Sequence, residues 1–178
     1  VFDYFLNIHS RSSFNGHSEE IRCFTKNNSA GAFNAFYDDN ATDNKPSDDS
    51  FNFGEANGND GYNSLDIVGH EFTHGVINYT GSVKTPSGEP GALGESFGDI
   101  FGELVELYVL GTNDFIHRQE IGGGNRSLIN PKNFNHPNTF AGENWVDPTD
   151  LGNDFGGIHI NCGIQNYWFY LLSVGNTG

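Results

Sequence analysis

The strongest constraint on the fold of this chain is a pair of histidines placed four residues apart in a stretch with helical periodicity. Apolar side chains recur there at three- and four-residue steps, at Leu65, Val68, Phe72, Val76 and Tyr79. This period predicts a helix of about four turns that ends at Gly81. Residues four apart share one face of a helix, so His70 and His74 can present two imidazole nitrogens to one metal ion. Glu71 lies about 100° further round the axis, where it can reach a water on that ion, and the pattern is typical of zinc sites.

A second predicted helix supplies acidic side chains. Its apolar stripe recurs at the helical period, at Leu93, Phe97, Ile100, Phe101, Leu104 and Tyr108. The stripe predicts a helix over residues 92–110. Glu95, Asp99 and Glu103 follow one another at steps of four, and Glu106 comes three residues later. Such crowding destabilises a helix unless cations offset the charge, although a solvated acidic face is the simpler interpretation in an acidic chain. We expect Glu95 to be the third zinc ligand and Asp99 to accept the other N–H of a ligating histidine.

A third segment offers a histidine at the start of another helix. The helical pattern begins near Ile160, and His159 precedes it after the turn that Gly156 and Gly157 predict. A histidine in such a position can point into a cleft, and a nearby carboxylate such as Asp154 can hold its tautomer and favour its charged form. Taken alone, a histidine of this kind is more often structural.

The other segments have the composition of strands and loops. Short aromatic and β-branched pieces predict strands in residues 1–5, 21–25 and 32–37. Asp, Asn and Gly dominate residues 38–63, and prolines interrupt residues 111–157, so we expect loops in both regions.

The charge of the chain argues against two classes of partner. Its 23 acidic side chains outnumber the 8 basic ones and give a formal charge of −15. Nucleic acids and anionic membranes both attract clustered Lys and Arg, so we expect neither as a partner. No run approaches the roughly eighteen apolar residues of a membrane span, which favours a soluble chain. The chain begins at Val1 and contains no Met, so we expect it to be processed or partial. Cys23 and Cys162 are compatible with one disulfide or two free thiols.

Three motifs in this order resemble those of the thermolysin-like neutral metalloproteases, a family of secreted zinc endopeptidases also known as M4 peptidases. The motifs are GHEFTH at residues 69–74, GALGESFGDIFG at residues 91–102 and GGIHIN at residues 156–161. The resemblance covers nearly the whole chain, and residues 34–37 look like the substrate-binding edge strand of the family.

The resemblance implies an α+β fold of the zincin, thermolysin-like type. A β-rich N-terminal lobe, residues 1–80, would end in the HExxH helix, and residues 81–178 would form a helical C-terminal lobe. Relative to a typical catalytic domain of the family, we expect both lobes to be partial.

The resemblance also implies a zinc-dependent activity. His70, His74 and Glu95 would bind Zn²⁺, Glu71 would polarise the zinc-bound water, and Asp99 would orient His70. The reaction would be hydrolysis of peptide bonds in a peptide or protein substrate, with the metal as Lewis acid and activator of water. The expected location is extracellular.

Other matching residues would handle the substrate. His159, oriented by Asp154, would stabilise the oxyanion of the tetrahedral intermediate across the cleft. Asn34 and Ala35 would pair with the substrate backbone, and Arg126 would lie beside the pocket for the residue after the scissile bond.

Calcium is the second metal that the resemblance implies. Asp66, Glu106 and Asp114 match acidic positions of the structural calcium site of the family. The later part of that site, residues 115–119, lacks most of the family's carboxylates, so one Ca²⁺ is expected rather than two.

Two departures from the family pattern affect the active site. The family usually has Asn before the glutamate ligand, where this chain has Gly94, and no tyrosine occurs between Gly81 and Pro90, where the family has an oxyanion donor. His159 is therefore expected to carry a larger share of oxyanion stabilisation. The alternative function is a non-catalytic, metal-bound fragment that serves in binding or assembly. A zinc hydrolase of another substrate class is a third hypothesis.

Overall fold

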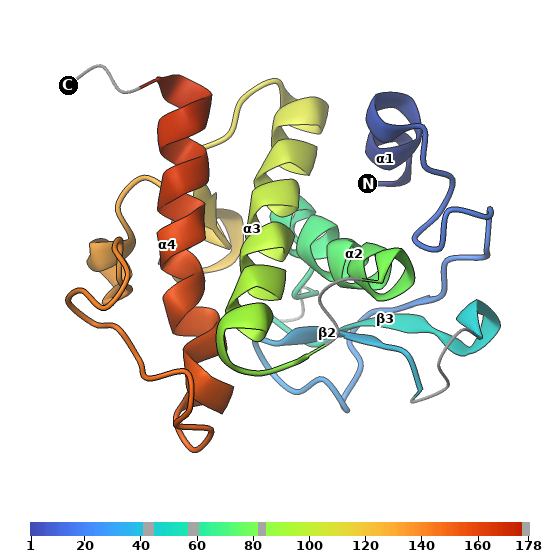
Figure 1. The fold of residues 1–178 in the computed structure, drawn as a ribbon. Coiled ribbons are helices and arrows are strands. Elements are labelled where there is room, and N and C mark those ends of the chain that lie inside the picture. Colours follow the sequence, from blue (N-terminus) through green and yellow to red (C-terminus); the bar gives the residue numbers. More distant parts are fainter. Residues whose placement is uncertain (41–44, 57–60, 82–84, 176–178) are drawn as a thin grey trace.

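The architecture is given by a computed structural model that describes residues 1–40, 45–56, 61–81 and 85–175. In chain order its elements are α1 (Phe2–His9), β1 (Cys23–Phe24), β2 (Ala35–Asp38), η1 (Pro46–Asp48), β3 (Ser50–Phe53), α2 (Leu65–Thr80), α3 (Gly88–Leu110), β4 (Ile116–His117), η3 (Gln119–Ile121), β5 (Arg126–Ser127), η4 (Pro131–Phe134) and α4 (Asp154–Val174). Figure 1 shows α3 and α4 side by side, with α2 packed against α3 and the strands β2 and β3 below α2. The α+β class predicted from the sequence is confirmed.

The first helix occupies a segment for which the sequence predicts a strand. That prediction for residues 1–5 is wrong, because α1 is helical from Phe2 to His9. Val1, Tyr4 and Phe5 fall at i, i+3 and i+4 and pack on the core, with the Phe5 ring centroid 4.9 Å from that of Phe72. Tertiary contacts of this inward face stabilise a two-turn helix, whereas five residues are too few for a helical period to be told from alternation.

A three-stranded sheet has the order β1-β3-β2, with β1 parallel and β2 antiparallel to β3. β1 and β2 overlap two predicted strands, but the central strand β3 lies in residues 38–63, where a loop is predicted. That prediction is wrong because the two phenylalanines of β3 stand in a stretch dominated by Asp, Asn and Gly. All four residues of β3 are buried, and the polar Asn52 is satisfied by a 2.7 Å hydrogen bond from Asn27.

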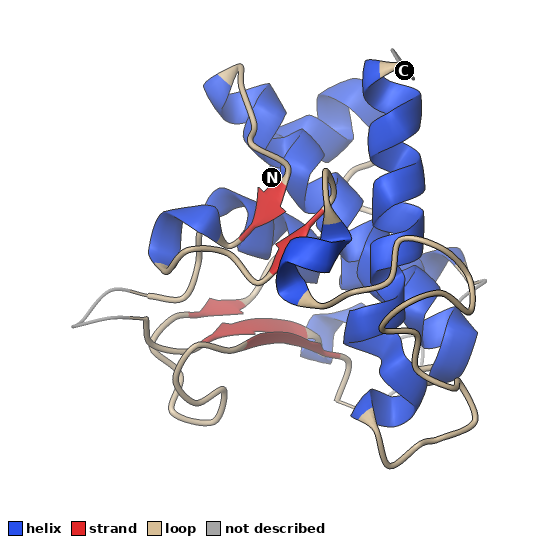
Figure 2. Cartoon of the chain, turned by 90° about the vertical axis from the view of Figure 1, so that its left-hand side faces the viewer, coloured by secondary structure: helices blue, strands red, loops and turns tan. Residues whose placement is uncertain are grey.

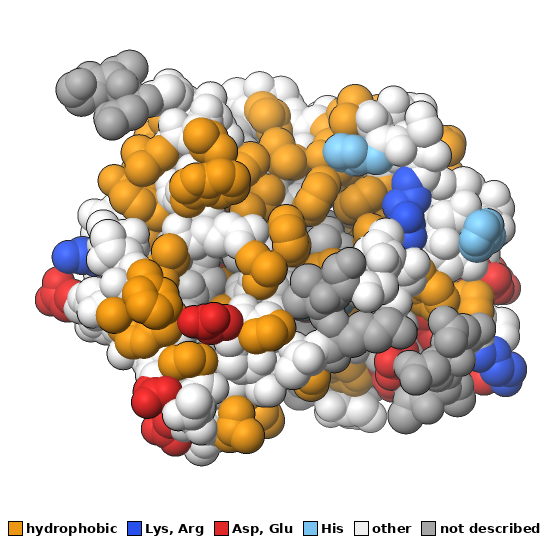
Figure 3. Space-filling view, in the orientation of Figure 1, with side chains coloured by type: hydrophobic (Ala, Val, Ile, Leu, Met, Phe, Trp, Pro, Cys, Tyr) orange, Lys and Arg blue, Asp and Glu red, His pale blue; other side chains and the backbone are white. Residues whose placement is uncertain are grey.

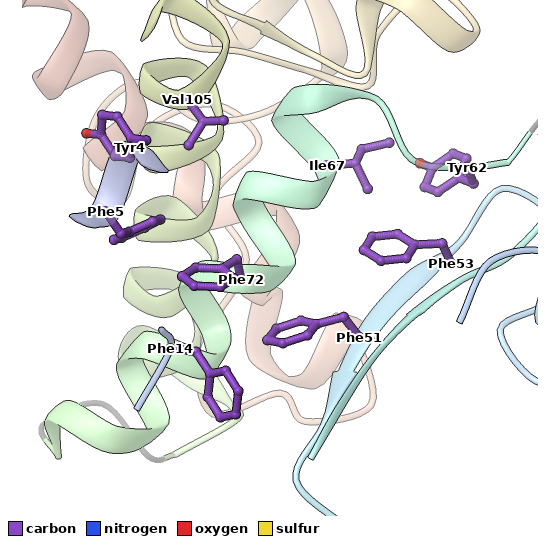
Figure 4. Packing of buried hydrophobic residues seen from close by; sticks show 9 residues of the cluster. All are labelled: Tyr4, Phe5, Phe14, Phe51, Phe53, Tyr62, Ile67, Phe72 and Val105. Carbon is purple, nitrogen blue, oxygen red and sulfur yellow. The ribbon is translucent and has the colours of Figure 1, made fainter. Parts of the chain in front are cut away.

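The hydrophobic core lies between β3 and α2 (Figure 4). Phe51 and Phe53 project from β3 toward α2, and Phe51 stacks on Phe72 with ring centroids 5.7 Å apart and an 18° angle between the planes. Ile67 of α2 faces the same core and is 1% exposed. Each such side chain contributes roughly 1.5–3 kcal/mol on burial. This packing fixes the rotation of α2 above the sheet.

α2 and α3 approach closely because glycines face the contact. A Cβ on Gly102 would overlap the carbonyl oxygen of Asp66, and one on Gly98 would lie 2.6 Å from the imidazole of His70. The missing side chains let the carboxylates of α3 reach the imidazoles of α2. α2 begins and ends as the sequence predicts, whereas α3 begins at Gly88 rather than Ala92.

α4 begins with an irregular turn, at Asp154 rather than near the predicted Ile160. Residues 155–157 have left-handed φ values of 53°, 85° and 75°. Two of these residues are glycines, which adopt this conformation without steric penalty. The turn brings Asp154 back over His159, and the regular helix that follows packs along α3.

The prediction of a loop-rich region between α3 and α4 is confirmed in outline. Only short elements occur there, and β4 and β5 pair as a separate two-stranded sheet (Figure 2).

Apolar side chains are exposed toward the ends of α3 and α4. Leu110, Trp168 and Leu172 are all more than half exposed. Figure 3 shows apolar side chains gathered on the half of this face where the two helices lie. No described helix is long and apolar enough to cross a membrane. The two cysteines are free thiols, with Cys23 exposed and Cys162 buried.

Candidate metal centre

Three side chains from α2 and α3 converge on one point. His70 and His74 project from the same face of α2, and their Nε2 atoms are 3.0 Å apart. Glu95 of α3 completes the group, with Oε2 3.4 Å from Nε2 of His70 and Oε1 3.3 Å from Nε2 of His74. His70 and Glu95 are buried, and His74 is partly buried.

The spacing of these atoms matches that of ligands around a tetrahedral zinc ion. Ligands at about 2.0–2.2 Å from zinc stand roughly 3.3–3.6 Å apart at tetrahedral angles. The observed separations of 3.0, 3.3 and 3.4 Å fall at or near this range. Two imidazoles and one carboxylate are also a usual donor set for catalytic zinc with an open fourth position. The residues present therefore fit a zinc ion.

Asp99 lies behind the three donors and orients one of them. Its Oδ1 lies 3.0 Å from Nδ1 of His70, and its two oxygens accept from the Arg126 guanidinium at 2.6 and 2.7 Å. Asn166 of α4 donates to Oδ2 at 2.8 Å. Because a carboxylate only accepts, Nδ1 of His70 carries a proton, so Nε2 is the nitrogen that can bind a metal ion in place of a proton.

Burial and neighbouring charges shift the pKa values of these groups in opposite directions. Burial alone would raise the pKa of Asp99, but the Arg126 guanidinium holds it far below its usual value. Burial alone would lower the pKa of His70, yet its interactions with Asp99 and Glu95 raise it to about 10. Burial would likewise raise the pKa of Glu95, and the imidazoles of His74 and His70 hold it well below its usual value. The site thus favours a positive charge, which a proton or a metal ion supplies.

His159 faces Glu95 from α4. Its Nδ1 donates to Oδ1 of Asp154 at 2.7 Å, and its backbone N–H donates to Oδ2 at 2.8 Å, so Asp154 fixes both the ring and the start of the helix. Nε2 of His159 lies 3.5 Å from Oε2 of Glu95. The side chain is 47% exposed, so a molecule in front of the three donors can reach it.

A cleft of about 460 Å³ opens in front of the donors. Glu71 and Arg126 line it, and so do Asn34 and Ala35 at the start of β2. Ala35 pairs with Phe53 of β3, and the other side of β2 is an open sheet edge within the described residues. An extended peptide can add to such an edge through backbone hydrogen bonds.

Arg126 lines the cleft and also forms a buried ion pair with Asp99. It lies on β5, is 7% exposed, and directs its guanidinium at Asp99. Burial would lower its pKa, but the Asp99 carboxylate raises it, so the side chain stays charged. Arg126 therefore neutralises the residue that orients His70.

The residues predicted to bind calcium fall into two neighbouring groups. Glu106 and Asp114 lie with Glu103, whereas Asp66 lies with Glu103 and His117, and the ligand atoms within each group are within 4.8 Å of one another. Burial, aided by nearby carboxylates, raises the pKa of Glu103 to about 9 and that of Glu106 to about 8. Glu103 is fully buried, which rules out a solvated acidic face at this position.

Sequence reasoning did not assign Glu103, His117 and Asn166 to the site. For Glu103 a signal was available, because it follows Asp99 by four residues on the same helix face. His117 comes from β4 and Asn166 from α4, and no local spacing connects either of them to α2.

Two family models match consecutive parts of this chain. The thermolysin metallopeptidase catalytic domain matches residues 1–78, and the thermolysin metallopeptidase alpha-helical domain matches residues 85–178.

Curated proteins and a solved structure agree with these matches. Thermolysin of Alicyclobacillus acidocaldarius subsp. acidocaldarius is 32% identical over 186 residues, which cover 99% of this chain and 31% of that protein. The zinc metalloproteinase of Renibacterium salmoninarum is 36% identical over 127 residues, 66% of this chain and 23% of that protein. The precursor of protealysin, a metalloproteinase from Serratia proteamaculans, has a similar fold, with a TM-score of 0.74 and 22% identity over 97% of this chain and 56% of that one. This chain spans about a third of the length of the curated relatives that match nearly all of it.

Proposed function

Because the chain belongs to the thermolysin metallopeptidase family, we propose that it is a zinc-dependent endopeptidase that hydrolyses peptide bonds. The observation that carries this proposal is the convergence of His70, His74 and Glu95 in a cleft that Glu71 and His159 also line. We further propose that the protein acts outside the cell, on peptide or protein substrates.

The proposed roles near the donors follow from their positions. Zinc held by His70, His74 and Glu95 supplies Lewis acidity, which polarises a carbonyl group and makes water a better nucleophile. Glu71 accepts the proton of the attacking water, since its carboxylate lines the cleft without belonging to the donor set. Asp99 keeps the proton of His70 on Nδ1, so that Nε2 stays free to bind metal.

His159 acts on the carbonyl oxygen as negative charge builds there. Asp154 accepts from Nδ1 of His159 and orients the ring, so Nε2 would donate to the carbonyl oxygen when both ring nitrogens carry a proton. One preorganised donor is worth about 2.7–4 kcal/mol in enzymes where it has been removed. No tyrosine between Gly81 and Pro90 shares this task, so His159 carries a larger part of it.

The substrate binds as an extended strand along the open edge of β2. Asn34 and Ala35 pair with its backbone, and Arg126 borders the pocket for the residue after the scissile bond. We propose that the cleft separates a β-rich lobe, residues 1–80, from a helical lobe, residues 81–178.

Calcium is the second metal of the proposal. Glu106 and Asp114 would bind it as oxygen ligands. Asp66, the third calcium ligand expected from the sequence, lies instead in the group of Glu103 and His117. This ion would hold the C-terminal half of α3 to the segment that follows.

Cleavage of casein or of a short labelled peptide tests the proposed function. We expect activity to be lost with a zinc chelator, restored by zinc, and absent in Glu95→Gln. The matched control is Glu89→Gln, which removes an exposed carboxylate from the same helix and should leave activity unchanged. If the chain binds zinc and peptide but cleaves no substrate, the alternative of a non-catalytic, metal-bound fragment replaces this proposal.

A further inference from the structure

A buried carboxylate next to the metal centre lacks a partner. Glu103 of α3 is 0% exposed, and neither of its oxygens has a hydrogen-bond partner among the described residues. An unpaired carboxylate in the interior is strongly destabilising. Protonation does not remove the difficulty, because the resulting hydroxyl would need an acceptor of its own. A cation bound at this position would give the carboxylate the partner that it lacks.

Two other buried groups point to the same place. Asp66 of α2 is 1% exposed and His117 of β4 is 4% exposed. Nδ1 of His117 lies 3.4 Å from Oδ2 of Asp66 and makes no hydrogen bond within the described part of the chain. One ligand atom each from Asp66, Glu103 and His117 lies within 4.8 Å of the other two. The three come from separate elements, so their convergence is a product of the tertiary fold and not of crowding on one helix.

Hydrogen bonds from neighbouring groups hold the Asp66 carboxylate in place. Its carboxylate accepts from the hydroxyl of Ser64 and from the backbone N–H groups of Ile67 and Arg118. Several donors to one carboxylate fix its orientation. The carboxyl groups of Asp66 and Glu103 thus meet at one buried point, and no ion pair of Glu103 occurs among the described residues.

We propose that Asp66, Glu103 and His117 form a second, buried site for a divalent transition metal ion, of which zinc is the representative. The imidazole nitrogen of His117 favours a transition metal ion over calcium at this site. Zinc combines nitrogen and carboxylate ligands readily, whereas calcium takes six to eight oxygen ligands. The oxygen-only group of Glu106 and Asp114 is separate from this site and shares only Glu103 with it.

The second site lies directly behind the catalytic donors. The rings of His117 and His70 are 5.1 Å apart, and Asp99 lies between the two sites, 3.0 Å from Nδ1 of His70 and 3.7 Å from Nδ1 of His117. A cation there joins β4 to α2 and α3, the two helices that carry the donors. Its role is structural, and the proposal does not depend on the chain being a peptidase.

Counting bound zinc tests the proposal. The chain is stripped with a chelator, loaded with excess zinc in the absence and presence of calcium, freed of loose metal by gel filtration and analysed by elemental mass spectrometry. We expect two zinc ions per wild-type chain, one for each site, and no loss of either in calcium. Glu103→Gln and His117→Phe should each retain one zinc. Glu89→Gln is the matched control, since it makes the same change at an exposed position of α3 and should retain both.

The zinc counts of the variants distinguish failure of the proposed catalytic site from failure of the proposed second site. Glu95→Gln should retain one zinc, held at the second site. Suppose that the wild type binds one zinc ion, that Glu95→Gln binds none and that Glu103→Gln still binds one. This result would support the catalytic site and overturn the second site. If the variants do not fold, as judged by circular dichroism, the wild type decides alone, because displacement of its second zinc by calcium identifies an oxygen-ligand site and contradicts the proposal.

Discussion

Replacing Gly98 with alanine tests how strictly the metal centre depends on the close contact of α2 and α3. A Cβ at this position would lie 2.6 Å from Cε1 and Nδ1 of His70, whereas ordinary van der Waals contact begins at 3.4 Å. The imidazole or the helix must therefore move by about 0.8 Å, the difference between these distances. Zinc–ligand distances tolerate deviations of only about 0.2 Å. The substitution should thus act on metal binding as well as on stability.

Two effects on the free energy of unfolding oppose each other in this variant. Overpacking a filled interior costs about 1–3 kcal/mol, and alanine recovers about 0.5–1 kcal/mol of helix propensity relative to glycine. We expect a net loss of about 0–2.5 kcal/mol. Zinc affinity should fall about 10- to 100-fold, the range for changes to the partners that hold a metal-ligating histidine. A tenfold loss corresponds to about 1.4 kcal/mol of binding free energy.

The measurement is zinc competition against a chromophoric chelator, combined with thermal unfolding of the metal-free protein. Gly91→Ala is the matched control, because it lies on the same helix and its Cβ would meet Ile158 at 2.6 Å rather than a metal donor. It should lose stability and keep its zinc affinity. A folded Gly98→Ala variant that binds zinc as tightly as the wild type would refute the argument that this contact fixes His70.

Three further predictions concern catalysis and calcium. Glu71→Gln should keep zinc and lose most activity, because an amide does not accept the proton of water, and a parallel fall in metal content would contradict this role. His159→Ala should lower kcat/KM by roughly a hundredfold or more while zinc stays bound, whereas activity within a few fold of wild type would mean that another group is the oxyanion donor. Calcium should raise the thermal midpoint more at about pH 8.5 than at about pH 6, because burial raises the pKa of Glu106 to about 8 and the carboxyl must lose its proton before it binds a cation. Equal shifts at both pH values, measured at constant zinc, would count against Glu106 as a ligand.

The two long helices could be predicted because each carries an apolar stripe over several turns. α2 has the predicted bounds for that reason, and the four-residue spacing of its histidines sufficed to place both on one face. β3 could not be predicted, because its burial depends on distant partners such as Asn27, which satisfies Asn52. α1 was missed because its inward face becomes recognisable only once Phe72 and Phe101 are in place to receive Phe5.

The candidate site could be predicted only in part, for a related reason. The spacing of the acidic side chains on α3 indicated that they share one helix face, but not whether that face is buried. Glu103 was therefore compatible with a solvent-exposed stripe, whereas its side chain is fully buried. The separation of α2 and α3 depends on the contact of Gly98 and Gly102 with the facing helix, which no single-helix pattern contains. His117 reaches the site through the β4–β5 pairing, a non-local feature with no sequence spacing of its own.

The contacts of Asp99 also bear on the order in which the molecule assembles. Its partners His70, Arg126 and Asn166 lie 29, 27 and 67 residues away along the chain. Helices form from local contacts within microseconds, whereas contacts across such separations must first overcome the entropy of loop closure. The donors meet once α2 packs on α3, and the contacts that hold Asp99 behind them are completed only after β5 and α4 have also docked. Zinc uptake during refolding should lag behind the recovery of helical circular dichroism. The metal would then bind to the assembled structure and stabilise it, and would not initiate folding.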